Sequence, residues 1–282
     1  KVIIMNTDIK LVALDLDRTT LNSESHLSEV NRQALIDAIS NGVHVCIASG
    51  RAFDTLPEDI ISVPGIEYAI TSNGAAIYRI AGKECLKSYL LTPSSVKTIL
   101  NLTANDTVTY EAFIKGKAFA STEYIRHPEK YGATEHSLAY VKKTRILKDD
   151  IKDFILEHCH ELDSLDIVVG NEELKKNIMN RIRNATDEVY MTSSISQLLE
   201  ISYKDAGKKS GVKFLTEYLG LSRENVAAFG DADNDTDMIE YAGVGIAMEN
   251  AAPHLKQIAD HVTLHHDKDG VAYAFRNILN IC

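Results

Sequence analysis

Short apolar runs recur in the first and last thirds of the chain, and polar residues follow most of them at once. Such runs are typical of buried strands in a parallel sheet. Strands are expected at Leu11–Leu14, Val43–Ala48, Tyr68–Ile70, Val226–Phe229, Val244–Ala247 and His261–Leu264. Helical patterns follow Ser28 as far as Asn41–Gly42, cover Ala52–Ile61 with a break near Pro57, and begin again at Lys208. Alternating strands and helices with short loops predict an α/β fold with a mainly parallel sheet.

The pattern changes between residues 86 and 194, where the strand signals lie further apart and charged segments separate them. Strands are expected here at Val108–Ile114 and Leu165–Val169, and helices at Ser94–Leu102 and Asp149–Cys159. The first pattern then resumes at Leu198–Ile201. We therefore predict an inserted α+β domain at residues 86–194, which divides one core domain into residues 1–85 and 195–282.

Composition and charge narrow the class of protein. The chain has 282 residues, of which 45% are hydrophobic and 25% charged, as expected of a globular protein. Its formal net charge of -10, without a basic tract, argues against nucleic acid or a membrane surface as a partner. The apolar runs are too short to span a membrane, and no signal-peptide pattern opens the sequence. Its 4 cysteines are scattered, so reduced thiols and a cytoplasmic location are expected.

Several of the expected elements end or begin at polar side chains that suit chemistry. Taken singly, each is weak, because paired acids in loops are usually solvated and most Ser-Gly-Arg turns are only turns. A lysine at a helix start usually faces solvent, and an acidic run before a helix can simply cap it. Parallel strands, however, bring their carboxyl ends to one edge of the sheet, where ligands bind. The candidates at that edge are Asp15, Asp17, Ser49, Gly50, Lys208, Asp231, Asn234 and Asp235.

Together and in this order, these stretches resemble the haloacid dehalogenase (HAD) superfamily, and within it the Cof-type sugar phosphatases with a type IIB α/β cap. The resemblance covers both expected core segments, and no individual motif carries it in the insertion. It implies a Rossmann-like core, an inserted cap domain, and a phosphatase that acts on a small phosphorylated substrate. The matching stretches are Leu14–Thr19, Ala48–Arg51, Ser72–Ala75, Lys208, Gly230–Asp235, Tyr241–Met248 and Asp269–Ala272.

The resemblance also implies catalytic roles that agree with the chemistry of the side chains. Asp15 would be the nucleophile, because a carboxylate that attacks phosphorus splits one difficult displacement into two easier ones. Asp17 would protonate the leaving alcohol and later activate water, so it should hold a proton while Asp15 is ionised. Lys208 would offset the negative charge that gathers in the site.

The same resemblance implies a Mg²⁺ site and a phosphate site. Mg²⁺ takes hard oxygen ligands, which the carboxylates of Asp15 and Asp231 and the backbone carbonyl of Asp17 would supply, with Asp235 in support. Phosphoryl oxygens would be held by the remaining candidates. These are Ser49 with the backbone of its loop at Gly50, Asn234, and Lys208.

Two positions depart from the family pattern. Arg18 stands where the family usually has glycine after the second aspartate, and a left-handed conformation there would cost arginine about 1 kcal/mol. We favour a solvent-facing Arg18 over a substrate contact. Lys208 is followed by Lys209 where the family has glycine, so Lys209 is an alternative to Lys208 as the catalytic lysine.

We therefore predict a Mg²⁺-dependent phosphatase that acts on small phosphorylated metabolites, above all sugar phosphates. One alternative is a phosphosugar mutase, which would return the phosphoryl group to a sugar rather than to water. Another is a catalytically weakened metabolite-binding or sensor protein, suggested by Arg18 and Lys209. The oligomeric state is left open.

Overall fold

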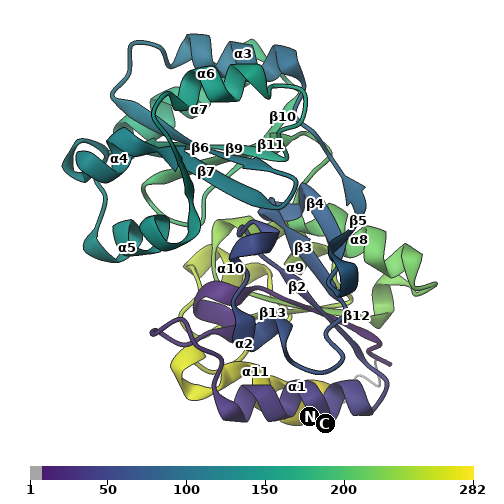
Figure 1. Ribbon diagram of the computed structural model, residues 1–282. Helices are drawn as coiled ribbons and strands as arrows, with labels where there is room; N and C mark the ends of the chain where they lie inside the picture. Colours follow the sequence, from purple (N-terminus) through teal and green to yellow (C-terminus); the bar gives the residue numbers. More distant parts are fainter. Residues whose placement is uncertain (1–7) are drawn as a thin grey trace.

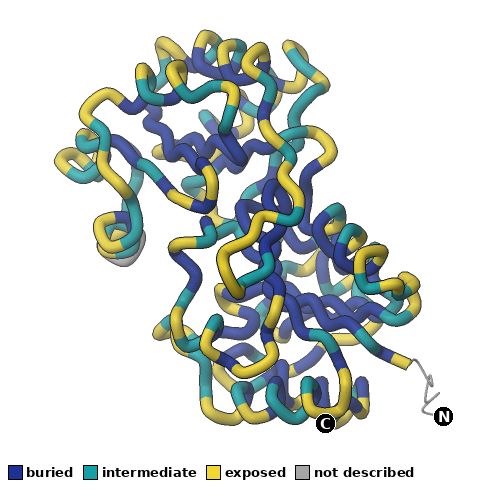
Figure 2. The backbone as a smooth tube through the Cα atoms, turned by 45° about the vertical axis from the view of Figure 1, so that its right-hand side comes forward, coloured by how far each residue is buried: buried dark blue, intermediate teal, exposed yellow. Residues whose placement is uncertain are grey.

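A computed structural model describes residues 8–282, so the first seven residues of the expected core segment lie outside the described residues. The strands form two separate sheets, one of eight strands and one of six, which we call the core sheet and the cap sheet. Figure 1 shows the core sheet below and the cap sheet above it. Buried residues are concentrated in the strands of both sheets, whereas the outer helices carry most of the exposed positions (Figure 2).

The core sheet is built around β1 (Leu11–Leu14), which is entirely buried and pairs in parallel with β2 (His44–Ala48) and β12 (Val226–Gly230). Apolar residues on both faces of these strands require cover on both sides, which the surrounding helices supply. The remaining parallel strands are β3 (Tyr68–Thr71), β13 (Val244–Ala247) and β14 (His261–Val262), and the antiparallel ones are β4 (Ala76–Arg79) and β5 (Glu84–Ser88). The predicted α/β fold with a mainly parallel sheet is confirmed.

The helices of the core follow the pattern that the sequence predicted. Ser28 caps α1 (Glu29–Ser40) by accepting a hydrogen bond from the backbone N–H of Asn31. The helical stretch at 52–61 is interrupted at Pro57, as expected, and consists of a 3₁₀ turn at Phe53–Thr55 followed by α2 (Glu58–Ile61). The other core helices are α8 (Lys208–Tyr218), α9 (Thr236–Tyr241), α10 (Pro253–Ile258) and α11 (Gly270–Ala274).

The cap sheet is largely antiparallel, in the order β10-β11-β9-β6-β7-β8. Its strands are β6 (Val108–Ile114), β7 (Lys117–Ser121), β8 (Ile146–Lys148), β9 (Ser164–Val169), β10 (Val189–Thr192) and β11 (Leu198–Tyr203). Its outer face packs on α3 (Pro93–Leu102), α6 (Ile151–Glu157) and α7 (Glu172–Ala185), as Figure 1 shows. Two further helices, α4 (Thr122–Arg126) and α5 (Glu135–Thr144), belong to the same part of the chain.

Alternation along the strands gives the cap sheet a second, polar face. Apolar residues such as Tyr110 and Ile167 belong to the hydrophobic cluster under the outer helices. Their neighbours Glu111, Asp166 and Glu200 stand opposite one another on β6, β9 and β11, so they share the other face. Glu200 accepts a hydrogen bond from Asn73 of the core, so this polar face lies toward the core sheet.

One expected boundary differs from the sheet assignment. The core was expected to resume at residue 195, but β11 pairs with β9 and β10 in the cap sheet. An apolar run identifies a strand without identifying its partners, which are set by contacts distant in sequence. The chain therefore returns to the core after Tyr203, at the loop before α8. Among the described residues, no helix is long and apolar enough to cross a membrane.

Candidate active site

Asp15 follows the last residue of β1, at the carboxyl edge of the core sheet. Its side chain is only 8% exposed, and its Oδ1 atom lies 2.7 Å from Nζ of Lys208. The hydroxyl of Thr20 donates a 2.6 Å hydrogen bond to the backbone carbonyl of Asp15, which holds the turn that leaves the strand. The end of β1 thus places a buried carboxylate at the edge where ligands bind in α/β folds.

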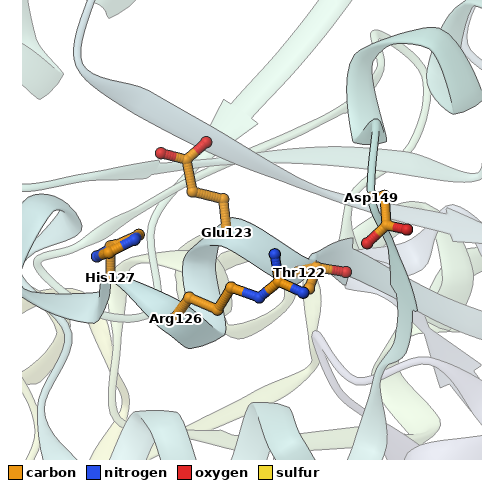
Figure 3. Close-up of a pocket in the computed structure, with 5 residues that line it drawn as sticks. All are labelled: Thr122, Glu123, Arg126, His127 and Asp149. Atoms are coloured by element: carbon orange, nitrogen blue, oxygen red, sulfur yellow. The ribbon is translucent and has the colours of Figure 1, made fainter.

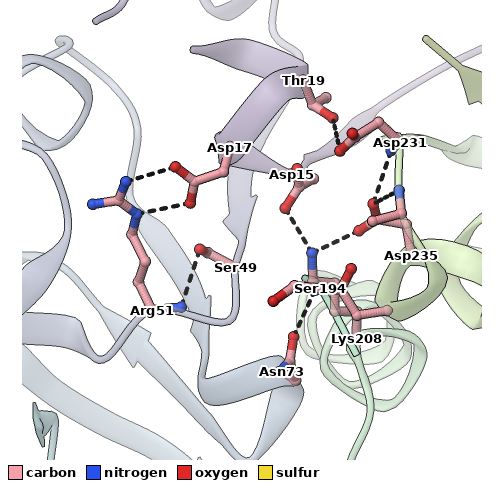
Figure 4. Close-up of polar contacts among 12 residues, drawn as sticks. Asp15, Asp17, Thr19, Ser49, Arg51, Asn73, Ser194, Lys208, Asp231 and Asp235 are labelled. Atoms are coloured by element: carbon pink, nitrogen blue, oxygen red, sulfur yellow. Dashed lines mark hydrogen bonds and ion pairs between the residues drawn. The ribbon is translucent and has the colours of Figure 1, made fainter. Parts of the chain in front are cut away.

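Lys208 is fully buried at the first position of α8, and its ammonium group also donates to Oδ1 of Asp235 at 2.6 Å (Figure 4). Burial lowers the pKa of Lys208, but the carboxylates of Asp15 and Asp235 outweigh that effect and hold this pKa above its usual value. Lys209 is exposed, whereas Lys208 is buried and bonded to two carboxylates, so the geometry favours Lys208 as the lysine of this site.

Asp231 and Asp235 come from the loop that follows β12. Oδ2 of Asp235 accepts hydrogen bonds from the backbone N–H groups of Asp231 and Ala232, at 2.9 and 3.0 Å, and this folds the loop back on itself. The hydroxyl of Thr19 donates to Oδ1 of Asp231 at 3.3 Å. Carboxylate oxygens of Asp15, Asp231 and Asp235 all lie within 4.8 Å of one another, as expected of residues that share a cation.

The electrostatics of this cluster favour a bound cation. Burial raises the pKa of Asp15 well above its usual value, and the carboxylates of Asp235 and Asp231 raise it further against the opposing effect of Lys208. Burial and the carboxylate of Asp235 raise the pKa of Asp231 to about 7. Three buried carboxylates beside one ammonium group leave an excess of negative charge. A divalent cation with a preference for oxygen ligands fits this donor set.

Asp17 lies close to Asp15 in sequence but points away from it, toward Arg51 (Figure 4). Nε and Nη2 of Arg51 donate to the two carboxylate oxygens at 2.9 and 2.6 Å. The guanidinium fork holds the Asp17 carboxylate on the side away from Asp15, and the acid and base role expected of Asp17 stays a prediction. Arg51 was missed as a site residue, although it completes the Ser-Gly-Arg turn that the sequence analysis quoted.

The loops after β2 and β3 meet beside the carboxylate cluster. The backbone N–H of Asn73 donates to the carbonyl of Ser49 at 3.1 Å, and Nδ2 of Asn234 donates to Oδ1 of Asn73 at 3.0 Å. Nδ2 of Asn73 in turn donates to Oε1 of Glu200 at 2.9 Å. A side chain at Gly50 would meet that same Glu200 oxygen at 3.0 Å, so the cap sheet lies directly over this loop. Asn73 and Glu200 were not predicted as site residues.

Arg18 has a left-handed backbone, with φ of 62° and ψ of 14°. Its side chain is 65% exposed, in agreement with the expected solvent-facing position, and its Nε atom lies 3.8 Å from Oδ2 of Asp231. Asn250 donates a 2.8 Å hydrogen bond to the backbone carbonyl of Arg18 and so supports the turn.

Two of the cavities in the described part of the chain differ in their relation to these residues. One, of about 490 Å³, lies between the two sheets and reaches Arg18 and Asp231. The other, of about 420 Å³, contains none of the predicted site residues and lies in the cap (Figure 3). Its lining residues are Thr122, Glu123, Arg126, His127 and Asp149.

A buried lysine that joins two carboxylates at the carboxyl edge of a parallel sheet, beneath a second sheet inserted in the chain, defines a phosphatase of the HAD type. The chain belongs to that family, since the model of the haloacid dehalogenase-like hydrolases matches residues 12–275. It is 32% identical over 273 residues to the 5-amino-6-(5-phospho-D-ribitylamino)uracil phosphatase YcsE of Bacillus subtilis, covering 96% of each chain.

Solved structures share the whole arrangement. A haloacid dehalogenase-like hydrolase from B. subtilis aligns with a TM-score of 0.82 at 26% identity, covering 96% of this chain and 100% of the other. A HAD subclass IIB sugar phosphatase aligns with a TM-score of 0.82 over 97% of this chain, although only 20% of the residues are identical, and this likeness concerns the fold. The expected resemblance to Cof-type HAD proteins is confirmed.

Proposed function

We propose that this phosphatase is Mg²⁺-dependent and hydrolyses small phosphorylated metabolites, most of all sugar or polyol phosphates, through an aspartyl-phosphate on Asp15. The observation that carries the proposal is the buried contact of 2.7 Å between Asp15 and Lys208, beside the carboxylates of Asp231 and Asp235. The name of the relative YcsE, a phosphatase of a phosphorylated ribityl compound, supports a polyol or sugar phosphate as the substrate class.

In the first half of the proposed reaction, a carboxylate oxygen of Asp15 attacks phosphorus while the bond from phosphorus to the alcohol oxygen breaks. Asp17 gives its proton to that departing oxygen. In the second half, water attacks the phosphorus, Asp17 takes a proton from the water, and inorganic phosphate leaves as Asp15 is regenerated. Asp17 has to part from Arg51 to reach the leaving oxygen, because its carboxylate points away from Asp15 (Figure 4).

Charge and position supply most of the catalysis in phosphoryl transfer. We assign the cation site to Asp15, Asp231 and Asp235 with the backbone carbonyl of Asp17, and a bound Mg²⁺ would neutralise charge on the phosphoryl oxygens there. Lys208 holds Asp15 in place and offsets its charge throughout. The Ser49 hydroxyl, the backbone at Gly50 and the amide of Asn234 would bind the remaining phosphoryl oxygens.

The cap is proposed to act as a domain of its own that excludes water and selects the substrate. Its sheet and helices are formed by the residues between β5 and α8. Glu200 lies over the Ser49–Gly50 loop. In this division the core consists of the segments before and after the cap. A location in the cytoplasm is part of the same proposal, on the basis of the scattered, reduced cysteines.

The decisive test is the Asp15→Asn variant, assayed for release of inorganic phosphate from a panel of phosphorylated sugars and polyols. The wild-type protein should release phosphate only when Mg²⁺ is present, and the variant should release none. Asp153→Asn, on the exposed side of α6, removes a carboxylate far from the site and should leave the rate unchanged.

The outcomes separate the proposal from its two alternatives. An isomerised sugar phosphate formed without free phosphate would identify a mutase. Binding of a sugar phosphate without turnover, observed as thermal stabilisation of the wild-type protein, would identify a sensor. Phosphate release that persists in Asp15→Asn at the wild-type rate would refute Asp15 as the nucleophile.

A further inference from the structure

Arg18 is the one departure from the family pattern within the nucleophile loop that the proposed reaction does not use. Its φ of 62° lies in the region where glycine is free and other residues are strained. A residue kept in a strained conformation beside an active site indicates that its side chain has a role. That side chain is 65% exposed, and the nearest carboxylate oxygen, Oδ2 of Asp231, lies at 3.8 Å from Nε, beyond the range of a hydrogen bond.

Arg18 lines the cavity of about 490 Å³ between the core and the cap. This volume is in the range of pockets that hold small metabolites, roughly 300–1,000 Å³. Asp231 forms part of the cavity wall on the core side, so the cavity is continuous with the proposed phosphoryl-transfer site. A substrate whose phosphate sits at Asp15 would place the rest of its body here.

The cap side of the same cavity presents a second cation. Lys175 on α7 has a side chain that is only 6% exposed, and its ammonium group donates to the hydroxyl of Ser193 at 3.1 Å and pairs with Glu172 at 3.0 Å. Two further hydroxyls, those of Ser194 and Ser196, line the cavity beside it. The Ser193 hydroxyl is directed at the backbone carbonyls of Ile195 and Leu198, so Lys175 supplies the positive charge of this wall.

Three acidic residues, Glu172, Asp231 and Asp233, line the same cavity. Glu172 is half exposed and already pairs with Lys175, and Asp233 pairs with His254 at 3.2 Å on the surface. Asp231 belongs to the carboxylate cluster that fits a divalent cation. With that cation in place, the charge of Asp231 would be satisfied, and the guanidinium of Arg18 would be left for the substrate.

We propose that Arg18 from the core and Lys175 from the cap bind a second anionic group, a phosphate or a carboxylate, on the leaving-group side of the substrate. The inference rests on the proposed phosphatase function and narrows its substrate class to phosphorylated metabolites that carry another negative charge. The guanidinium fork and the ammonium group are the side chains that recognise such groups. Because the two cations come from opposite sides of the cavity, a doubly charged substrate would also draw the cap onto the core.

The test compares matched substrates that differ in one anionic group. Fructose 1,6-bisphosphate is set against fructose 6-phosphate, and 6-phosphogluconate against glucose 6-phosphate, so that both kinds of second anion are covered. The wild-type protein should have the higher kcat/KM for the member with the second anionic group in at least one pair. Arg18→Gly and Lys175→Gln should each lower kcat/KM for that member roughly tenfold, mostly through KM, since each removes a charge-assisted contact.

The losses of both variants on the member without the second anionic group should be clearly smaller than their losses on the member that carries it. Lys176→Gln is the matched control, because Lys176 is the next residue on α7 but is 71% exposed and lies outside the cavity lining. Equal losses on both members of a pair, or no loss on either, would overturn the subsite. A purely structural role of Arg18 predicts neither the selectivity nor its dependence on the second charge.

Binding to the Asp15→Asn protein separates failure of the subsite from failure of the proposed function. Isothermal titration should give a dissociation constant for fructose 1,6-bisphosphate that rises roughly tenfold when Arg18→Gly is added. If no phosphomonoester is hydrolysed by the wild-type protein but this difference persists, the reaction is wrong and the subsite stands. An unchanged dissociation constant overturns the subsite, whatever the outcome for hydrolysis.

Discussion

The left-handed backbone conformation of Arg18 should lower the free energy of unfolding by a measurable amount. With φ of 62°, it carries a strain that glycine lacks, so Arg18→Gly should raise the free energy of unfolding by up to about 1 kcal/mol. Urea denaturation followed by circular dichroism checks this change. Ser25 has a similar φ of 61° in a neighbouring turn, and Ser25→Gly should act in the same direction. A lower stability of both variants would show that the greater freedom of glycine in the unfolded chain outweighs the strain.

Asp163 in the cap is a buried carboxyl with an unusual dependence on pH. Burial raises its pKa from 3.8 to about 6, although the Ser88 hydroxyl donates to its Oδ1 atom and opposes the shift. Since the folded-state pKa lies above the unfolded one, ionisation of Asp163 costs stability progressively as the pH rises from about 4 to about 6.

Asp163→Asn removes that cost and should make the protein more stable at neutral pH than the wild type, by an amount on the order of 1–3 kcal/mol. The difference should disappear below about pH 3, where the wild-type carboxyl is protonated in both states. Urea denaturation at a series of pH values measures it. Parallel curves for the two proteins across that range would contradict the assignment.

Some site residues were within reach of the sequence, and others were not. Asp15, Lys208 and Asp231 sit in stretches whose order along the chain is itself a pattern, and the parallel sheet brings those stretches to one edge. Arg51 and Asn73 lie in quoted turns, but their partners depend on side-chain direction. Glu200 reaches the site only because β11 joins the cap sheet, which a local pattern does not reveal.

At the scale of elements, the start of α8 decides where Lys208 lies. Gly74 has φ of 88° and lies against Gly207, the residue before Lys208. A Cβ added to Gly74 would lie 1.9 Å from the carbonyl oxygen of Gly207. Only glycine fits this contact between the turn after β3 and α8.

Gly74→Ala should therefore displace α8, lower the free energy of unfolding by an amount on the order of 2 kcal/mol, and reduce kcat by moving Lys208. Gly82→Ala is the matched control, since Gly82 also has a positive φ of 76° but an added Cβ there would meet nothing within 4 Å. Thermal denaturation and phosphate release measured on both variants check the prediction. Equal effects of the two substitutions would mean that backbone strain alone, and not the approach to α8, is responsible.

A local sequence pattern predicts where a helix or strand begins and ends, but not which strands pair. Leu11–Leu14 and Val244–Ala247 were expected with the bounds that the structure has, because an apolar run and the polar residues that follow it are local signals. Pairing is not local: β11 looked like a return to the core and is a strand of the cap sheet. The break near Pro57 in the stretch at 52–61 was within reach of the sequence, because a proline is a local signal.

For the whole molecule, the carboxylates of Asp15, Asp231 and Asp235 should couple folding to cation binding. A cation that binds only the folded state stabilises it by about 2.7 kcal/mol at a concentration one hundred times its dissociation constant. Adding Mg²⁺ should therefore raise Tm, and EDTA should reverse the increase.

Asp231→Asn should abolish this response of Tm, whereas Asp163→Asn, which also removes a buried carboxylate, should keep it. Differential scanning calorimetry with and without Mg²⁺ measures both. A response that survives in Asp231→Asn would place the cation elsewhere.

The pairing of β1 with both β2 and β12 has a consequence for how the chain is made. A nascent chain that has reached residue 203 contains every strand of the cap sheet, but of the core sheet only β1 to β5. The cap sheet can then assemble while one edge of β1, next to the nucleophile, still waits for a strand more than two hundred residues away. Contacts so distant in sequence form late, and an apolar edge left open invites pairing with other chains. The interval between residues 203 and 226 is therefore the stretch of synthesis in which this protein is most exposed to aggregation.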